Sequence, residues 1–278
     1  MKRTSHTVAI GLALILVACN RTDTGASENV QSDAAVTNLN ALNGVWKADL
    51  SSVKFEGKPD QFLLQAGTWK CDTCIPPLST AADGQFHPVA DRPYYDSMSV
   101  KIVDDRTVEF HRRKGKREVG NNTMQVSADG NVLTNKFHDA TTAGSEFDGT
   151  TTLRRAGPSP AGAHALSGQW KPEKVGNYTE EALRLNYQVD GSKVTSSIQG
   201  QAYVAEVDGP AVAVQNDPGG TTVAVTREGA GLKETYTRDG KQVAIVTVSP
   251  NPDGASVMIT NTDPRDGSKT TWTASKGS

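Results

Sequence analysis

Short stretches in which apolar and polar residues alternate recur along most of the chain and predict β-strands. In residues 97–103 the apolar side chains of Met98, Val100 and Ile102 fall on one face, and residues 183–189 show the same alternation. A period of two is typical of a strand with one buried face, whereas a helix repeats every 3.6 residues. No long stretch has the helical period, so the pattern predicts an all-β protein.

Turn signals separate these stretches. The dipeptide Asp-Gly occurs eight times, typically between two alternating runs. Asp-Gly suits the positive φ angles of tight hairpin turns, so neighbouring strands should pair as antiparallel hairpins. Residues 241–248 are apolar on both faces and should form a central strand. Because closure of a sheet removes its exposed edges, we expect small up-and-down barrels or sandwiches.

The strand pattern occurs twice. LNGVWK at residues 42–47 returns as LSGQWK at residues 166–171, a shift of 124 residues, and further matches follow in the same order. This internal repeat predicts two tandem β-domains, residues 41–156 and residues 166–278. Residues 157–165 lie between them and are rich in Pro, Gly and Ala, which indicates a linker.

The first residues have the plan of a secretory signal peptide. Lys2 and Arg3 precede an uncharged apolar run at residues 7–18 that is short for a membrane span. We therefore expect a signal peptide at residues 1–18. Residues 19–40 are small and polar, without a hydrophobic period, and predict a flexible tether.

The end of the apolar run, LVAC at residues 16–19, resembles the lipobox of bacterial lipoproteins. The resemblance implies cleavage after Ala18, lipidation of Cys19 and a membrane as partner through the attached acyl chains. It also implies a cell-envelope location. In Gram-negative lipoproteins an Asp after the cysteine favours the inner membrane. Asn20 stands there, so the periplasmic side of the outer membrane is expected.

Charge excludes one class of partner. The formal net charge is −2, and a nucleic-acid-binding protein would carry a strong basic excess. The basic run HRRKGKR at residues 111–117 is interpreted as a solvated hairpin tip. We expect no nucleic-acid partner.

Cys71 and Cys74 form a C-x-x-C pair that has three interpretations. Without Cys19 they are the only cysteines, and in an oxidising envelope they would form a disulfide. Zinc is an alternative because His87 and Asp91 follow at suitable spacing, but Pro88 and Pro93 exclude the helix of a zinc finger. Thiol–disulfide redox chemistry is a further alternative, which needs a low-pKa thiolate that the flanking residues do not favour.

The start of each repeat, Gly44-Val-Trp46 and Gly168-Gln-Trp170, resembles the G-x-W that opens the first strand of lipocalins. In that superfamily a late arginine packs over the tryptophan. The resemblance implies that Arg154 or Arg155 covers Trp46. The second repeat has Lys276 as its nearest cation. The alternatives are two tryptophans that close a packed core and a barrel that holds an apolar ligand.

The mature chain also resembles a group of bacterial envelope proteins to which we can attach no activity. The shared features are the G-x-W-K starts, the C-x-x-C pair, the segment PYYD at residues 93–96 and the segment DPGGTT at residues 217–222. This resemblance implies a location in the envelope and no particular chemistry.

Catalytic motifs do not stand out. The chain has no G-x-S-x-G elbow, no P-loop and no His-x-x-x-His pair, and DTG at residues 23–25 has no second copy to complete an aspartic dyad. We therefore expect no enzyme, no cofactor and no metal. The leading hypothesis is a membrane-anchored envelope lipoprotein with a structural or interaction role. The alternatives are a lipocalin-like protein that binds a small apolar ligand and, third, a C-x-x-C redox protein.

Overall fold

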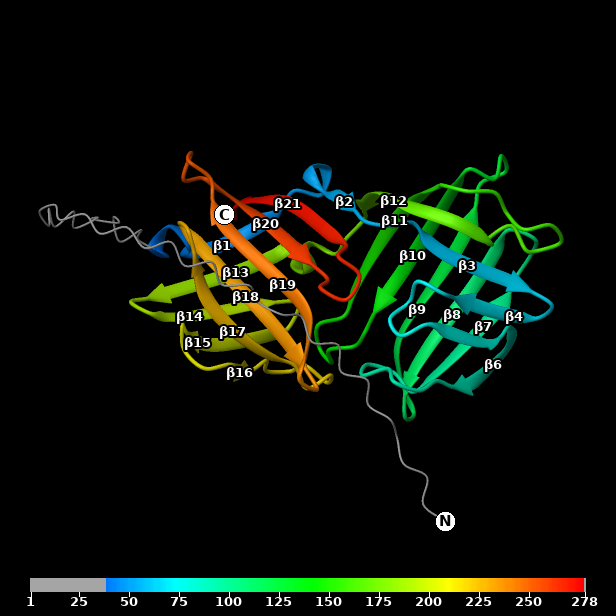
Figure 1. Cartoon of the computed structure of the whole chain (residues 1–278), viewed down its shortest axis with the longest axis horizontal. Helices are drawn as coiled ribbons and strands as arrows, with labels where there is room; N and C mark the ends of the chain where they lie inside the picture. Colours follow the sequence, from blue (N-terminus) through cyan, green and yellow to red (C-terminus); the bar gives the residue numbers. More distant parts are fainter. Residues whose placement is uncertain (1–38, 278) are drawn as a thin grey trace, which may run out of the picture. The chain divides into compact units, whose positions relative to one another are not determined.

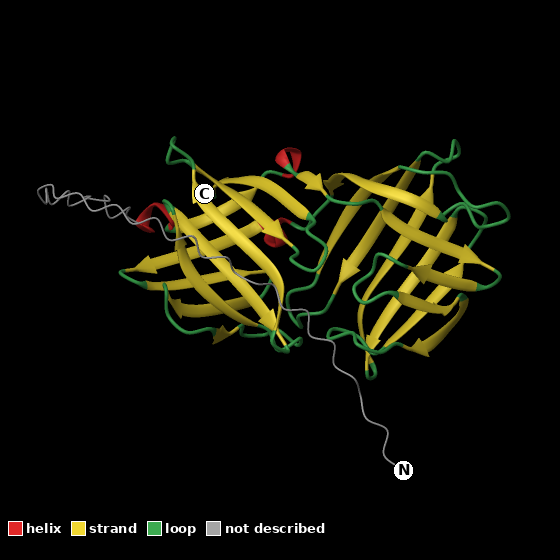
Figure 2. Cartoon of the chain, viewed as in Figure 1, coloured by secondary structure: helices red, strands yellow, loops and turns green. Residues whose placement is uncertain are grey.

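The computed structural model describes residues 39–277, which are built almost wholly from β-strands (Figure 2). The strands form two nearly closed antiparallel sheets, so the prediction of two tandem β-barrel domains is confirmed. The predicted signal peptide, Cys19 and nearly all of the predicted tether lie outside the described residues. Leu39 and Asn40, which the prediction includes in the tether, belong to a 3-10 helix, η1 (Leu39–Leu42).

One barrel, called the N-terminal barrel, is continuous in sequence (Figure 1). Its edge strands follow each other along the chain with only Ala82 between them, so the sheet curls until its edges come close. Its ten strands are β3 (Asp60–Gln65), β4 (Thr68–Cys71), β5 (Leu78–Ala81), β6 (Asp83–Pro88), β7 (Ser97–Ile102), β8 (Thr107–Lys114), β9 (Arg117–Val126), β10 (Val132–Asp139), β11 (Phe147–Arg155) and β12 (Gly168–Gly176). Their order in the sheet is β5-β4-β3-β12-β11-β10-β9-β8-β7-β6.

The other barrel, called the C-terminal barrel, is discontinuous. The short strand β1 (Gly44–Ala48) pairs with both β13 and β21 and so joins the two ends of the later strands. Those strands are β13 (Arg184–Asp190), β14 (Lys193–Ile198), β15 (Gln201–Glu206), β16 (Val212–Ala213), β17 (Thr222–Glu228), β18 (Gly231–Arg238), β19 (Lys241–Pro250), β20 (Ser256–Thr262) and β21 (Lys269–Lys276). A further strand, β2 (Lys54–Glu56), pairs with β21 outside this path.

The two barrels have the same strand order, as the internal repeat predicts, but their limits differ from those of the sequence repeats. β1 belongs to the first repeat and lies in the C-terminal barrel, whereas β12 belongs to the second repeat and lies in the N-terminal barrel. The predicted linker, residues 157–165, therefore joins two neighbouring strands of one barrel, β11 and β12. In an up-and-down barrel the first and last strands are neighbours. The G-x-W strand can therefore be the first strand of one barrel or the last strand of the other without a change in strand order.

Two segments carry the chain from one barrel to the other. Residues 49–59 contain η2 (Leu50–Ser52), which begins where the Asp49 side chain accepts a hydrogen bond from the Ser51 amide at 2.9 Å. Residues 177–183 contain η3 (Glu180–Leu183). We call these the crossing segments.

Each barrel encloses an apolar core. The predicted inward positions Met98 and Val100 are buried, but Ile102 is 42% exposed because it ends its strand. The N-terminal core also contains Trp69, Phe110 and Trp170, and the C-terminal core contains Trp46, Tyr187, Val225 and Ile259. Residues 241–248 lie within β19, between β18 and β20, as predicted for a central strand.

Most of the predicted Asp-Gly turns are present, but Asp83-Gly84 lies within β6 and Asp148-Gly149 within β11. Between β18 and β19, Asp239 and Gly240 have φ angles of 49° and 71°, the positive pair that a two-residue hairpin requires. The basic run at residues 111–117 likewise contains the β8–β9 turn, with Gly115 at φ 60°.

Candidate functional site

The G-x-W strand of the N-terminal barrel is covered by an arginine. Arg155 pairs with Trp170 across β11 and β12, and its guanidinium lies 4.1 Å from the centre of the indole ring. It also donates hydrogen bonds to three main-chain carbonyl oxygens, those of Gly130 at 2.6 Å, Ala165 at 2.7 Å and Ser167 at 2.9 Å. A Cβ at Gly168 would lie 2.8 Å from this guanidinium, so the glycine of this G-x-W is required for the contact.

The C-terminal barrel repeats the arrangement with a lysine. Lys276 pairs with Trp46, and its Nζ lies 5.5 Å from the ring centre. The expectation that Arg154 or Arg155 covers Trp46 is therefore wrong, because the strand that carries both arginines pairs with β12 and not with β1. Both tryptophans are fully buried, and both indole N–H groups donate to the carbonyl four residues earlier.

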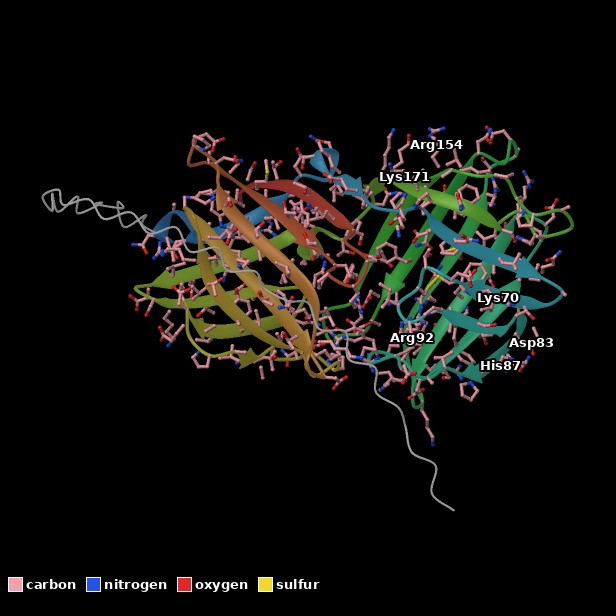
Figure 3. The ribbon with its side chains drawn as sticks, viewed as in Figure 1. Lys70, Asp83, His87, Arg92, Arg154 and Lys171 are labelled. Carbon is pink, nitrogen blue, oxygen red and sulfur yellow. A yellow bond between two sulfur atoms is a disulfide. The ribbon has the colours of Figure 1, made fainter. Side chains whose placement is uncertain are left out.

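Arg154, a predicted barrel-closing residue, points the other way along β11. Its side chain is 59% exposed and forms an ion pair with Glu173 at 3.1 Å (Figure 3). Alternation along a strand places neighbours on opposite faces, so Arg155 takes the covering role and Arg154 the outer one.

The C-x-x-C pair lies where β4 ends. Cys71 and Cys74 lie at disulfide distance, with 2.09 Å between their sulfur atoms (Figure 3). Arg92 fixes the loop that follows by donating to the carbonyl oxygens of Ile75, at 3.1 Å, and Pro76. His87, the third residue of the alternative zinc set, pairs instead with Asp83 at 2.9 Å. The structure therefore does not assemble the zinc ligands considered above.

A buried polar cluster in the C-terminal barrel was missed by the sequence analysis. Glu234 is almost completely buried on β18, and three tyrosine hydroxyls donate to its carboxylate. The Tyr203 and Tyr236 hydroxyls lie 2.7 and 2.6 Å from it, and Tyr187 also contacts Oε1. Burial raises the pKa of the Glu234 carboxyl, and the three hydroxyls act in the opposite direction. Burial also raises the pKa of Tyr187 well above its ordinary range. A glutamate between Leu232 and Tyr236 at an inward position was the available signal.

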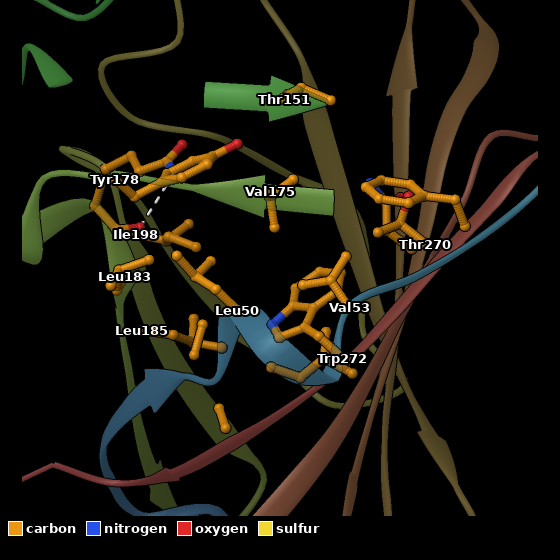
Figure 4. A pocket seen from close by; sticks show the side chains of 17 residues that line it. Leu50, Val53, Thr151, Val175, Tyr178, Leu183, Leu185, Ile198, Thr270 and Trp272 are labelled. Atoms are coloured by element: carbon orange, nitrogen blue, oxygen red, sulfur yellow. Dashed lines mark hydrogen bonds between the residues drawn. The ribbon is translucent and has the colours of Figure 1, made fainter. Parts of the chain in front are cut away.

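A cavity of about 440 Å³ lies at one end of the C-terminal barrel (Figure 4). We call it the barrel-mouth cavity. Its walls include inward-facing residues at the ends of β1, β13, β14, β20 and β21: Ala48, Leu185, Ile198, Ile259, Trp272 and Ala274. The register places Ile259 opposite Trp272, which confirms that these side chains share the inner face.

The crossing segments cover this cavity. Leu50, Val53 and Phe55 come from the first segment and its strand β2, and Tyr178, Ala182 and Leu183 from the second. Gln199 fixes η3 against the barrel by donating to the carbonyl of Ala182 at 3.3 Å. The passage of the chain between the barrels therefore builds the cover.

The chemistry of the cavity is uniform. Its lining contains no Asp, Glu, Lys, Arg or His, and the polar groups are Gln199, Asn261, Tyr178 and two threonines. Such a lining can hold an apolar molecule and orient it with a few hydrogen bonds. Burial raises the pKa of the Tyr178 hydroxyl, so this lining group stays a protonated hydrogen-bond donor. Trp272 is the one tryptophan of this lining and is only partly buried.

Within residues 39–277, no helix has the length and apolar character needed to span a membrane. No protein-family model, no curated protein and no solved structure matches the chain. The barrels also differ from the lipocalin pattern in strand number, because lipocalin barrels have eight strands, whereas the N-terminal sheet has ten and the C-terminal sheet has eleven including β2.

Proposed function

We propose that this protein is a lipid-anchored envelope protein that binds a small apolar molecule in the barrel-mouth cavity and does no catalysis. The observation that carries the proposal is the cavity itself. Its volume of about 440 Å³ falls in the range of small-molecule sites, and an apolar wall with a few polar groups is the usual composition of such sites. The part of the ligand inside the cavity is uncharged, because no ionised side chain lines it.

Intrinsic fluorescence tests this proposal. Trp46, Trp69 and Trp170 are buried in the cores, whereas Trp272 lines the cavity, so an occupant should change the emission of Trp272 alone. The test uses the full chain with the Cys19→Ser substitution, prepared without detergent. We expect the uncharged dye N-phenyl-1-naphthylamine to quench the tryptophan emission of this protein. The response should vanish in Trp272→Phe. Quenching that persists in Trp272→Phe would place the dye elsewhere.

A matched pair of substitutions locates the site. Ile198 and Val204 lie on the neighbouring strands β14 and β15 and are 38% and 41% exposed, but only Ile198 lines the cavity. Glutamate at position 198 would place a charge against the apolar occupant, so Ile198→Glu should weaken dye binding by about tenfold or more. Val204→Glu should leave the affinity unchanged. Equal affinity in both variants, measured by fluorescence titration, would exclude the barrel mouth as the site.

The anchor is tested separately. If Cys19 carries the acyl chains, Cys19→Ser should move the protein from the membrane fraction to the soluble fraction. Retention in the membrane fraction, measured by immunoblot after alkaline carbonate washing, would contradict lipidation as the means of attachment. The disulfide between Cys71 and Cys74 belongs to the same proposal, because it needs an oxidising compartment.

A purely structural or interaction role is the second candidate. It is favoured by the N-terminal barrel, whose interior is filled by the apolar core around Trp69, Phe110 and Trp170. Native mass spectrometry of the mature protein separates the candidates, because a ligand-binding protein should retain a small apolar molecule. A redox role is less well supported, since Cys71 is buried and the short loop beyond Cys74 is held by Arg92.

A further inference from the structure

Two segments far apart in the sequence meet at Arg238. The Arg238 Nη2 group donates to the Tyr94 hydroxyl and to the Thr221 hydroxyl, the latter at 2.7 Å. The guanidinium lies 4.7 Å from the centre of the Tyr94 ring. Tyr94 belongs to the PYYD segment and Thr221 to the DPGGTT segment, so the arginine joins both.

The DPGGTT turn fits the guanidinium closely. A Cβ at Gly219 would lie 2.8 Å from Arg238 Nη2, so a larger residue there would displace the guanidinium from this position. The Asp217 side chain, 1% exposed, lies 3.9 Å from Nη2 and accepts hydrogen bonds from the amides of Gly219 and Thr221. Arg238 itself is 14% exposed, and its Nε–H is buried with no hydrogen-bond partner among the described residues. An acceptor at this edge would remove that cost.

A second arginine faces the same space. Arg238 and Arg265 line a cavity of about 230 Å³ together with Tyr94 and Tyr236, which we call the arginine cavity. Arg265 uses Nε and Nη2 on Asp263, at 2.8 and 2.6 Å, and its side chain remains 37% exposed. Guanidinium groups present five donors in a fork that matches carboxylate and phosphate oxygens.

A third cavity shares lining residues with both the arginine cavity and the barrel-mouth cavity. This cavity is small and polar, with a volume of about 190 Å³. It shares Ile198 and Gln199 with the barrel-mouth cavity and Tyr94 and Gln201 with the arginine cavity. The lining therefore changes from apolar, through polar groups that include Asp139, to a cavity lined by Arg238, Arg265 and Asp217.

We propose that the arginine cavity holds the anionic end, a carboxylate or a phosphate, of an elongated ligand whose apolar part lies in the barrel-mouth cavity. This inference rests on the proposed function, to which it adds the class of ligand: a single-chain anionic amphiphile. Arg265 supplies free donors at an exposed position, and Arg238 supplies a fixed positive charge that Asp217 and Thr221 hold in place.

The test compares two probes that differ only in charge. Tetradecanoate and its neutral amide are titrated against the Cys19→Ser protein, with Trp272 emission as the readout. We expect the carboxylate to bind about tenfold more tightly than the amide, the effect of one charge-assisted hydrogen bond. Arg265→Gln should remove this difference and leave the affinity for the amide unchanged. Arg154→Gln, the same change at an exposed arginine of the other barrel, should alter neither.

Each other outcome has a definite meaning. If both probes bind equally and Arg265→Gln has no effect, the proposed function stands and the anionic end is excluded. If neither probe changes Trp272 emission, the apolar site fails as well. If inorganic phosphate alone binds in an Arg265-dependent manner, measured by calorimetry, while neither probe moves Trp272, the site takes a free anion and the elongated ligand is overturned. Arg238→Gln is a less useful variant because it also removes the contacts to Tyr94 and Thr221.

Discussion

Arg155→Ala is expected to lower the free energy of unfolding by about 3–5 kcal/mol, because three carbonyl groups lose a charged donor at once. The guanidinium contacts Gly130 on one side and the loop before β12 on the other, and it covers Trp170 between them. Its removal would free the end of the barrel where β11 and β12 meet. Urea denaturation followed by circular dichroism measures the loss.

The neighbouring residue supplies the control. Arg154→Ala removes the same charge from the same strand, but only an exposed ion pair with Glu173 is lost. Such pairs contribute about 1 kcal/mol or less. Lys276→Ala should also have a small effect, since Lys276 Nζ lies 5.5 Å above Trp46 and its side chain is exposed. Equal losses for Arg154→Ala and Arg155→Ala would show that the contacts of Arg155 add nothing to stability.

The alternation of apolar residues carries enough information to locate the strands. The run at residues 97–103 corresponds to β7, and residues 241–248 are part of β19. Each pattern can be interpreted locally, because it reflects which side chains of a strand face the core and which face outward. The repeat also indicated two barrels of equal order. These features depend on neighbours in the sequence or on direct comparison of its two halves.

The sequence does not show to which barrel each G-x-W strand belongs. β12 can pair with β3 and β11 in one barrel, and β1 with β13 and β21 in the other, and both strands carry nearly the same sequence. The linker composition at residues 157–165 suits a hairpin loop as well as a domain boundary. The lipocalin resemblance placed the tryptophan in a first strand, which led to the wrong arginine contact.

The barrel-mouth cavity was beyond sequence reasoning for a related reason. Its cover comes from the crossing segments, which exist only because the chain passes from one barrel to the other twice. Leu50, Val53 and Tyr178 have no alternating pattern that distinguishes a cavity wall from a core. Their role depends on a three-dimensional arrangement that neither repeat contains alone.

The Glu234 cluster marks where the two cores differ. The registers place Tyr187 opposite Gly44 and Phe62 opposite Gly168. Tyr187 and Phe62 are therefore equivalent positions of the two barrels. Tyr203 corresponds by the same pairing to Leu78, and Glu234 corresponds to Phe110 by the shift of 124 residues. The N-terminal barrel therefore has apolar groups at the positions of Glu234, Tyr187 and Tyr203, whereas Tyr236 corresponds to Arg112 by the same shift.

Glu234→Leu is expected to destabilise the protein by about 4 kcal/mol or more, because buried tyrosine hydroxyls lose their acceptor. Glu234→Gln should cost less, since its amide oxygen can still accept from Tyr187 and Tyr203. The sharpest control introduces the residues of the N-terminal core, Glu234→Phe combined with Tyr187→Phe and Tyr203→Leu. This combination should recover most of the free energy of unfolding that Glu234→Phe alone loses. Simple addition of the single effects, measured by urea denaturation, would contradict a cluster that acts as a unit.

The pH dependence of stability follows from the same cluster. Burial raises the pKa of Tyr187 and Tyr203 well above the ordinary value of 10.0, and the charge of Glu234 adds to the shift. The folded protein therefore keeps these protons when the unfolded chain releases them, so stability is retained below pH 10 and falls as pH rises above it. Burial raises the pKa of Glu234 in the same sense, so its contribution is complete below its ordinary pKa of 4.5 and is lost as pH rises through the folded value. The triple variant should lose the dependence that comes from Glu234 and show a weaker fall above pH 10, because it keeps Tyr236, whose pKa burial also raises. A variant that keeps the wild-type fall above pH 10 would assign that fall to tyrosines outside the cluster.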